Sequence, residues 1–205
     1  MTKQTHQLAV LVSGSGTLLE RLISEDLPID RVIADKPCRG LRLAEEAGIP
    51  QEALYREHWG WDNSRKWNDQ QDFNREDFSV AIANCLNDRK ITIAAMAGFM
   101  TILSPEFFTT FKGVLLNIHP ALLPAFKGEK AVQDALDAGV KITGTTIHIA
   151  TPELDAGPII EQEAIRVMNG DTVDTLHERI KQVERPLYTR VLRELLAGTR
   201  ILPSH

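Results

Sequence analysis

Apolar and polar positions alternate in blocks along the first half of the chain. Four runs are almost continuously apolar, which predicts buried strands: QLAVLVSG, IDRVIAD, ITIAAMAG and GVLLNIHP. The stretches between them carry apolar residues at helical spacing or a Ser-Pro start, which predicts helices: TLLERLISED, RGLRLAEEAGIP, REDFSVAIANCLNDRK and a short, capped SPEFFTTF. Strands separated by helices indicate parallel βαβ units with helices on both faces of the sheet.

The pattern changes after Gly128. We expect a helix over 130–140 and two antiparallel strands within 143–167, around the loop PELDAGP. The tail 172–198 is expected to form one or two helices, interrupted or kinked near Pro186. The predicted fold class is therefore α/β, with a Rossmann-like, mostly parallel central sheet and an antiparallel C-terminal part.

The chain is expected to form one domain over 1–205, built from an N-terminal βαβ half over about 1–113 and a C-terminal half over about 114–205. Segment 55–74 does not fit either pattern. It holds all three tryptophans among polar residues and has little periodicity, so we expect a long loop with a few turns. Its aromatic side chains either pack on the body of the protein or serve an interface.

Composition restricts the class of partner. The net charge is -5, and no run of Lys or Arg exceeds a pair, so a basic face for nucleic acid is not expected. No apolar stretch approaches the ~18 residues that a membrane span needs. The polar start MTKQTHQ followed by a strand-like run does not read as a signal peptide. We therefore expect small-molecule partners and no membrane, with the chain acting as a monomer or a homodimer.

The two cysteines, Cys38 and Cys85, have neither the number nor the spacing for a disulfide framework or a zinc site. They are interpreted as ordinary buried or half-buried thiols. A reducing, cytoplasmic location is the simple expectation.

A glycine turn joins the first predicted strand to the first predicted helix. Gly14 and Gly16 in VSGSGTLLE expose backbone N–H groups at a helix N-terminus, where an anion is favoured. Asp35 ends the next strand, where a dinucleotide ribose would sit, but the third glycine of that fingerprint is replaced by Leu19. A phosphate monoester fits the turn better than a dinucleotide does, and a purely structural tight turn stays open.

Polar side chains interrupt the end of one core strand and the loop after another. Asn117 and His119 are two residues apart on an extended segment and therefore point to the same side. Asp155 lies in a loop bounded by Gly and Pro, after a strand that carries His148. Each stretch alone also fits a structural role, as a hydrogen-bonded corner or a turn-capping aspartate. Metal ligation is disfavoured because H-x-x-x-H-type spacing is absent.

Four segments in one order carry a resemblance: AVLVSGSGT, AGFMTILSP, LLNIHPALLPAFKG and GTTIHIATPELDAGPII. Together they closely resemble the glycinamide ribonucleotide (phosphoribosylglycinamide) formyltransferases, folate-dependent enzymes of purine biosynthesis. The likeness runs from about Leu8 to about Leu196. The combination N-x-H-P-x-L-L-P followed by L-D-x-G-P-I is specific to folate formyl-transferring domains.

The resemblance implies transfer of a formyl group from 10-formyltetrahydrofolate to the amine of phosphoribosylglycinamide, with no metal. Negative charge then develops on the formyl oxygen, where Asn117 and the imidazolium of His119 would donate hydrogen bonds. His119 would also give a proton to the departing N10 of the folate. Asp155 would stabilise the imidazolium, and His148 would support the loop or the proton path.

The resemblance also implies two binding sites. The ribonucleotide would be held by the glycine turn and by two residues of the C-terminal region: Gly14, Ser15, Gly16, Thr17, Leu18, Lys181 and Glu184. The folate would contact the FMTILS segment, an arginine and the catalytic loop: Arg75, Met100, Thr101, Ile102, Leu103, Asn117 and Asp155.

Two positions depart from the family pattern. Leu18 stands where members usually have Asn, which removes a side-chain contact to phosphate but leaves the backbone N–H. Thr101 stands where many members have Arg, and folate affinity falls if that guanidinium takes part in binding. The unusually long segment before Arg75 makes its match the weakest of the set.

Other functions stay open at this point. A sugar-nucleotide or other small-amine formyltransferase uses the same chemistry, and a paralogue that binds folate without turnover would also keep much of the pattern. A methionyl-tRNA formyltransferase or a formyltetrahydrofolate deformylase is expected to carry a further domain and, for the former, a basic surface. From another class, a dinucleotide-dependent oxidoreductase is opposed by the missing third glycine.

Overall fold

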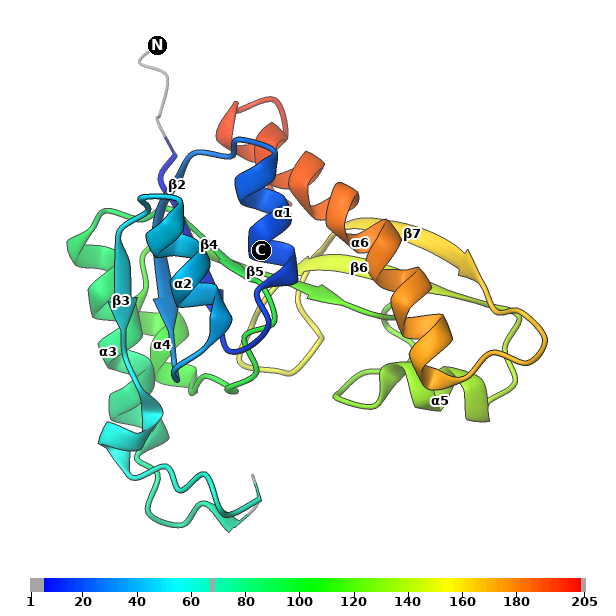
Figure 1. Cartoon of the computed structure of the whole chain (residues 1–205), viewed down its shortest axis with the longest axis horizontal. Helices are drawn as coiled ribbons and strands as arrows, with labels where there is room; N and C mark the ends of the chain where they lie inside the picture. Colours follow the sequence, from blue (N-terminus) through cyan, green and yellow to red (C-terminus); the bar gives the residue numbers. More distant parts are fainter. Residues whose placement is uncertain (1–5, 67–68, 204–205) are drawn as a thin grey trace. The chain divides into compact units, whose positions relative to one another are not determined.

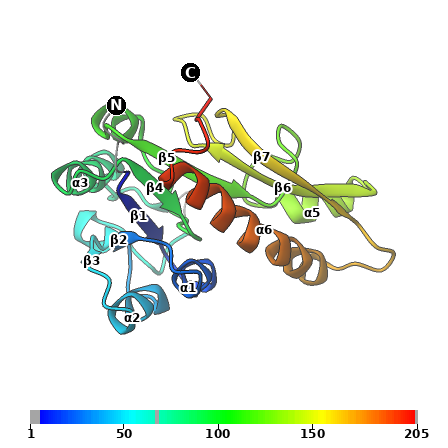
Figure 2. The same cartoon turned by 90° about the horizontal axis from the view of Figure 1, so that it is seen from above.

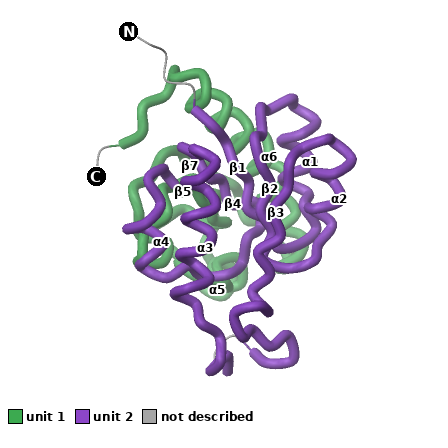
Figure 3. Tube along the Cα trace, turned by 90° about the vertical axis from the view of Figure 1, so that its left-hand side faces the viewer, with its two compact units in different colours: residues 1–5, 115–205 green, residues 6–114 purple. Residues whose placement is uncertain are grey.

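The computed structural model describes residues 6–66 and 69–203 of the chain. Its contacts divide the chain into two compact units, one over His6–Val114 and one containing Leu115–His205 (Figure 3). Each unit is described by itself below. That all 205 residues act as one formyltransferase domain stays a prediction.

The unit of residues 6–114 contains a parallel sheet in the order β3-β2-β1-β4 (Figure 1). Its strands are β1 Leu8–Val12, β2 Ile29–Ala34, β3 Gln51–Ala53 and β4 Ile93–Met96. Its helices are α1 Thr17–Ser24, α2 Arg39–Glu46, the 3-10 helix η1 Arg56–Trp59, α3 Arg75–Asp88 and α4 Pro105–Thr110. Figure 2 shows α1 and α2 on one face of this sheet and α3 on the other. Every residue of the central strand β1 is buried, as its continuous apolar run predicts.

The unit that contains residues 115–203 is built on three antiparallel strands. They are β5 Val114–His119, β6 Ile142–Ile149 and β7 Ile159–Arg166, and the helices are α5 Ala131–Asp137 and α6 Val173–Leu196. A small core joins both helices to β7, because Val132 of α5 and Leu176 and Ile180 of α6 pack with Ile165. The predicted α/β class, with a parallel part and an antiparallel C-terminal part, is confirmed.

The tail forms one helix, α6, with Pro186 inside it, so the first of the two expected outcomes, a single helix, is confirmed. Proline removes one backbone donor from the helix. The helix continues because its residues on both sides of Pro186 are buried, among them Ile180, Tyr188 and Leu192. The Tyr188 hydroxyl also donates to the Leu116 carbonyl oxygen on β5 at 3.0 Å, which ties this helix to the strand that carries the site.

Local details differ from the sequence expectations. The short strand β3 has too little apolar pattern to be foreseen, and η1 begins the tryptophan-rich segment 55–74, of which residues 67–68 lie outside the described part. Trp59 packs edge-on against Phe78 of α3, so one tryptophan packs on its own unit. The helix α4 begins with Pro105 after Ser104, but the Ser104 side chain makes no capping hydrogen bond.

Candidate functional site

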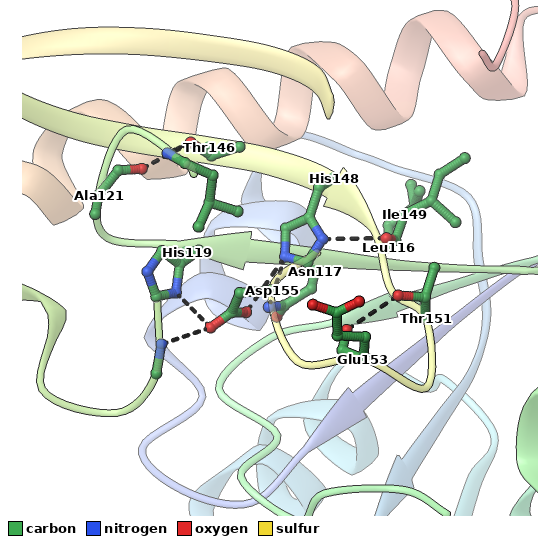
Figure 4. A network of polar contacts seen from close by, with 12 residues as sticks. Leu116, Asn117, His119, Ala121, Thr146, His148, Ile149, Thr151, Glu153 and Asp155 are labelled. Carbon is green, nitrogen blue, oxygen red and sulfur yellow. Dashed lines mark hydrogen bonds and ion pairs between the residues drawn. The ribbon is translucent and has the colours of Figure 1, made fainter. Parts of the chain in front are cut away.

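Strand β5 brings Asn117 and His119 to one face at its carboxyl end, as their spacing predicts. The antiparallel register places Asn117 opposite His148 on β6. The loop after β6 then returns Asp155 to the same place, so that the four predicted catalytic side chains converge (Figure 4). His119, His148 and Asp155 are buried, and Asn117 is half-buried.

Asp155 lies at the centre of the cluster. Its Oδ2 is 3.4 Å from Nδ1 of His119 and accepts a hydrogen bond from the Gly128 N–H at 2.8 Å, while Oδ1 is 3.6 Å from Nε2 of His148. Burial by itself raises the pKa of the Asp155 carboxyl. The contact with His148, the Gly128 N–H and the proximity of His119 outweigh burial, so the pKa of Asp155 lies below its ordinary range.

Each ring nitrogen of His119 faces an oxygen. Nδ1 faces the Asp155 carboxylate, and Nε2 lies 2.8 Å from the Phe126 carbonyl oxygen. A carbonyl oxygen only accepts, so Nε2 carries a proton and donates it to Phe126. A second proton on Nδ1 is matched by the carboxylate. The geometry therefore accommodates the doubly protonated ring that the proton-donor role needs.

His148 has a different arrangement of protons. Its Nδ1 lies 3.1 Å from its neighbour's carbonyl oxygen, on Ile149, so this nitrogen donates. Its Nε2 is 3.2 Å from Nδ2 of Asn117 and can then accept from that amide. Without a proton, Nε2 accepts from Asn117; with one, it faces the Asp155 carboxylate at 3.6 Å, and this second form is the one that lowers the pKa of Asp155.

The turn that carries Asp155 has a backbone conformation that needs support. Asp155 has φ 51°, in the left-handed region that few residues other than glycine adopt. Gly157 follows it, and a Cβ at that position would overlap the Ile149 carbonyl oxygen. The Ile149 N–H on β6 also donates to the Pro158 carbonyl oxygen of this loop at 2.9 Å. The glycine in L-D-A-G-P is therefore required by the close approach of the loop to β6.

Sequence reasoning missed two residues that hold the loop after His119. The Thr146 hydroxyl on β6 donates to the Ala121 carbonyl at 2.7 Å and accepts from the Leu123 N–H at 3.0 Å. The Gln162 amide on β7 donates to Thr146 at 2.9 Å and to the Leu123 carbonyl at 2.9 Å. Neither residue has a local signal, because both partners lie on other elements.

The glycine turn stands at the start of α1. Gly16 is the N-cap with φ 68°, and a Cβ there would lie 3.1 Å from Cα of Gly40 on α2, so glycine has a structural reason. The first N–H groups of α1, at Thr17 and Leu18, point out of the helix end as an anion site requires. Arg39 was not foreseen: it donates to the Ser15 carbonyl at 3.0 Å and pairs with Glu20 at 2.6 Å.

Lys181 and Glu184 lie on α6, in the other unit. Lys181 is half-buried, and its Nζ is 3.6 Å from Glu178. Burial raises the pKa of the Glu184 carboxyl to about 7. The Thr145 hydroxyl lies 3.2 Å from both Oε1 of Glu184 and the His119 carbonyl oxygen. Thr145 has a single proton, so both contacts are hydrogen bonds together only when Glu184 is protonated.

The FMTILS segment alternates between exposed and buried side chains. Met100 is 62% and Ile102 38% exposed, whereas Thr101 and Leu103 are buried. The Met100 N–H donates to the Ser13 hydroxyl at 3.0 Å, which fixes the start of the segment. The two exposed side chains present an apolar surface to solvent.

The remaining predicted folate residue, Arg75, is the first residue of α3 and is exposed. It shares the unit of residues 6–114 with the FMTILS segment, while Asn117 and Asp155 belong to the other unit. Asp35, the residue that would bind a dinucleotide ribose, is completely buried and accepts a hydrogen bond from Thr101 at 2.5 Å. That burial argues against the dinucleotide interpretation.

Within the described residues, no group of three or more His, Cys, Asp or Glu side chains is arranged to hold a metal ion. In the same part of the chain, no helix combines the length and the apolar character needed to cross a membrane. Cys38 and Cys85 are both free and half-buried, as the sequence predicts.

The sequence of this chain is similar to those of known formyl transferases. Residues 6–192 match the formyl transferase family. The chain is 38% identical over 205 residues to a phosphoribosylglycinamide formyltransferase of Mycobacterium tuberculosis, covering 97% of this chain and 86% of the relative. It is 41% identical over 204 residues to a human trifunctional purine biosynthetic protein, covering 96% of this chain and 19% of the relative. The chain therefore spans about a fifth of the length of such trifunctional relatives.

A solved structure shares the whole fold. Glycinamide ribonucleotide transformylase 1 of Symbiobacterium toebii superposes with a TM-score of 0.83 at 31% identity, covering 98% of this chain and 93% of the other. The match extends over the segments that carry the Asn117, His119, His148 and Asp155 cluster. From its sequence match, its fold and the convergence of this cluster, the chain belongs to the formyl transferase family.

Proposed function

We propose that this chain transfers the formyl group of 10-formyltetrahydrofolate to the amine of phosphoribosylglycinamide, a step of purine biosynthesis. One observation carries the proposal: the convergence of Asn117, His119, His148 and Asp155 at the end of β5. The names of the relatives in M. tuberculosis and S. toebii support the choice of acceptor. The formyl transferase family supports a folate-derived donor.

The reaction needs no nucleophilic side chain, because the acceptor amine attacks the formyl carbon. The formyl oxygen gains negative charge in the tetrahedral intermediate, and the Asn117 amide and the His119 ring are the donors that would stabilise it. The C–N10 bond then breaks, and His119 gives a proton to N10. The attacking nitrogen loses one proton, so His119 regains its starting charge if that proton returns to its ring.

His119 must first release a partner. Its Nε2 proton is donated to the Phe126 carbonyl at 2.8 Å, so this hydrogen bond has to break before Nε2 can face the formyl oxygen or N10. Asp155 stays on Nδ1 and holds the ring in place during the exchange. The low pKa of Asp155 keeps it ionised at neutral pH, so a carboxylate faces Nδ1 of His119.

The binding residues belong to the same proposal. The phosphate would lie at the N–H groups after Gly16, with Lys181 adding positive charge and Glu184 contacting the ribose. The folate ring would lie on the exposed side of the Met100–Leu103 segment, with Arg75 toward its acidic tail. We also keep a monomer or homodimer, a cytoplasmic location and the absence of nucleic-acid and membrane partners as proposals.

A direct assay tests the proposal. Purified chain is mixed with 10-formyltetrahydrofolate, with and without phosphoribosylglycinamide, and release of tetrahydrofolate is followed by absorbance. Release that requires the acceptor supports the function. Release without acceptor would point to hydrolysis, and release with an amino sugar nucleotide but not with phosphoribosylglycinamide would point to the sugar-nucleotide alternative. Binding of tetrahydrofolate without any turnover would leave the non-catalytic paralogue.

A further inference from the structure

A buried polar cluster lies directly behind the FMTILS segment. It consists of Asp35 after β2, Arg56 of η1 and Thr101, and we call it the Arg56 cluster. The Thr101 hydroxyl donates to Oδ2 of Asp35 at 2.5 Å and accepts from Nη1 of Arg56 at 3.1 Å. The same Nη1 lies 3.5 Å from Oδ2 of Asp35. One hydroxyl is therefore held between a carboxylate and a guanidinium.

Arg56 is fixed by its surroundings as well as by its charge. Its backbone N–H donates to the Asp35 carbonyl at 2.9 Å, and its guanidinium carbon lies 4.0 Å from the centroid of the Trp61 ring. The backbone N–H of Trp61 donates to the Arg56 carbonyl oxygen at 3.2 Å. The tryptophan-rich segment 55–74, which had no assigned role, thus provides both the guanidinium and the ring on which it stacks.

Burial makes the cluster hard to rearrange. The Asp35 side chain is 0% and the Arg56 side chain 10% exposed. A buried carboxylate without its cation is strongly unfavourable, and so is a buried guanidinium without its anion. Two further atoms, Oδ1 of Asp35 and Nε of Arg56, have no hydrogen-bond partner among the described residues, so the side-chain hydrogen bonds that join the pair run through Thr101.

The buried position of Thr101 determines the direction in which its neighbours point. Its side chain points inward, so Met100 and Ile102 on either side point outward, at 62% and 38% exposure. The Met100 N–H is held by Ser13, so the segment is fixed at its start by one hydrogen bond and at its centre by the Arg56 cluster. The position of the two exposed apolar side chains then depends on Arg56, which does not belong to the segment.

We propose that Arg56 is a positioning residue of the formyl-donor site. It acts through Thr101, and sets the Met100–Leu103 segment in the conformation that receives the folate ring. Arg56 reaches Thr101 from η1, where its Nη1 donates to the Thr101 hydroxyl at 3.1 Å. The inference rests on the proposed function, because it takes Met100–Leu103 as the donor-binding surface.

The experiment compares Arg56→Met and Arg56→Lys with a matched control, Arg31→Met. Arg31 on β2 also pairs with a carboxylate, Glu52, at 3.3 Å, but it lies outside the Arg56 cluster. The kcat and the KM of each substrate are measured, together with tetrahydrofolate binding by titration. Arg56→Met is expected to raise the donor KM and the tetrahydrofolate Kd about tenfold, with the acceptor KM within about twofold. Arg56→Lys is expected to lie between, because an ammonium lacks the planar fork.

Thr101→Val provides a second route if Arg56→Met does not fold. This variant keeps the charged pair and removes the hydroxyl, and it is expected to raise the donor KM but not the acceptor KM. Thr101→Ser keeps a hydroxyl, so its donor KM should be closer to that of the unaltered chain. An unchanged donor KM in Thr101→Val, or equal losses for both substrates in Arg56→Met, overturns the inference. Failure of the proposed function is seen separately, as the absence of formyl transfer by the unaltered chain.

Discussion

Asp155 and Asp35 are both buried carboxylates, but their partners give them opposite roles. Asp155 faces His119 and His148 and accepts the Gly128 N–H. Asp35 faces the Arg56 guanidinium and the Thr101 hydroxyl. Histidine gains and loses a proton near neutral pH, whereas arginine stays charged. The first arrangement can therefore move a proton, and the second can only hold a shape.

The two aspartates are also placed by different means. Asp35 directly follows β2 and takes its position from the parallel sheet. Asp155 lies in a loop, with φ 51°, and depends on the close approach of Gly157 to β6. Phe126, whose carbonyl faces His119, also has a positive φ, so two such residues lie in the region that we assign to the chemistry, while Asp26 and Lys90 lie outside it.

The largest effect is expected from His119→Ala. Removing the ring takes away an oxyanion donor and the proton donor together, so kcat should fall about a thousandfold, with both KM values within about threefold. Steady-state kinetics measure this, and His58→Ala, an exposed histidine of η1, is the control. A kcat close to that of the unaltered chain would show that His119 takes no part in the reaction. The proposed difference in role between Asp155 and Asp35 would then be wrong as well.

The two aspartates can be compared directly through Asp155→Asn and Asp35→Asn. Asp155→Asn should lower kcat about 10- to 100-fold, because His119 loses the carboxylate that holds its ring. Asp35→Asn should change kcat less and lower the free energy of unfolding by about 3 kcal/mol, because Arg56 is left buried without its anion. Steady-state kinetics and denaturant unfolding of the two variants measure these effects.

The Asp155 carboxyl also makes the stability of the fold depend on pH. Its pKa is lowered in the folded state, so its contribution is present above the unfolded value and is lost as pH falls through the folded pKa. In Asp155→Asn this fall in stability at low pH should be absent. Acid unfolding of both proteins, followed by circular dichroism, measures the difference. Identical acid unfolding of the two proteins would show that the carboxylate contributes nothing to the fold.

Gly157→Ala tests whether the Asp155 loop depends on its glycine. The added Cβ would overlap the Ile149 carbonyl oxygen, so the loop has to move away from β6. The free energy of unfolding should fall by about 2 kcal/mol, and kcat should fall with it. Gly14→Ala is the control for the free energy of unfolding, because neither Gly14 nor Gly157 has a positive φ and an added Cβ at Gly14 has nothing within 4 Å. Equal losses of stability in the two variants would mean that the contact with β6 does not fix the loop.

Glu184 is a third carboxyl, with a hydroxyl as its close partner, and its substitution should have the smallest effect on kcat. Its folded pKa of about 7 is above the ordinary value of 4.5, so the folded state binds more protons between these values. Stability should therefore decrease as pH rises from about 4.5 to about 7, by about 3 kcal/mol in total. Glu184→Gln should flatten this dependence, measured by denaturant unfolding at several pH values. A slope that persists in the variant would assign it to another group.

Much of the site was readable in the sequence because its parts are local. The two-residue spacing of Asn117 and His119 predicts a shared face on any strand, and the structure confirms it. The glycines at 14 and 16 predict a turn into a helix, and Gly16 is the N-cap of α1. The sequence left the tail open as one or two helices because of Pro186, and the structure has one, in which residues on both sides of Pro186 are buried.

What remained hidden depends on contacts between distant residues. Thr101 and Asp35 are 66 positions apart, and Thr101 and Arg56 are 45 apart, so no local pattern indicates that they share a cluster. The hydroxyl of Thr146 and the amide of Gln162, which hold the loop after His119, are equally unmarked. The resemblance marks position 101 as unusual, but the contacts of Thr101 with Asp35 and Arg56 were visible only in the structure.

The sequence by itself determined the alternation of strands and helices, the shared face of Asn117 and His119, and the family resemblance, because periodicity and motif spacing are local properties. The tertiary structure alone decided that Phe126 accepts the His119 proton, that burial raises the pKa of Glu184, and that Arg56 stands behind Thr101. These depend on which groups burial brings together and on how little water remains between them.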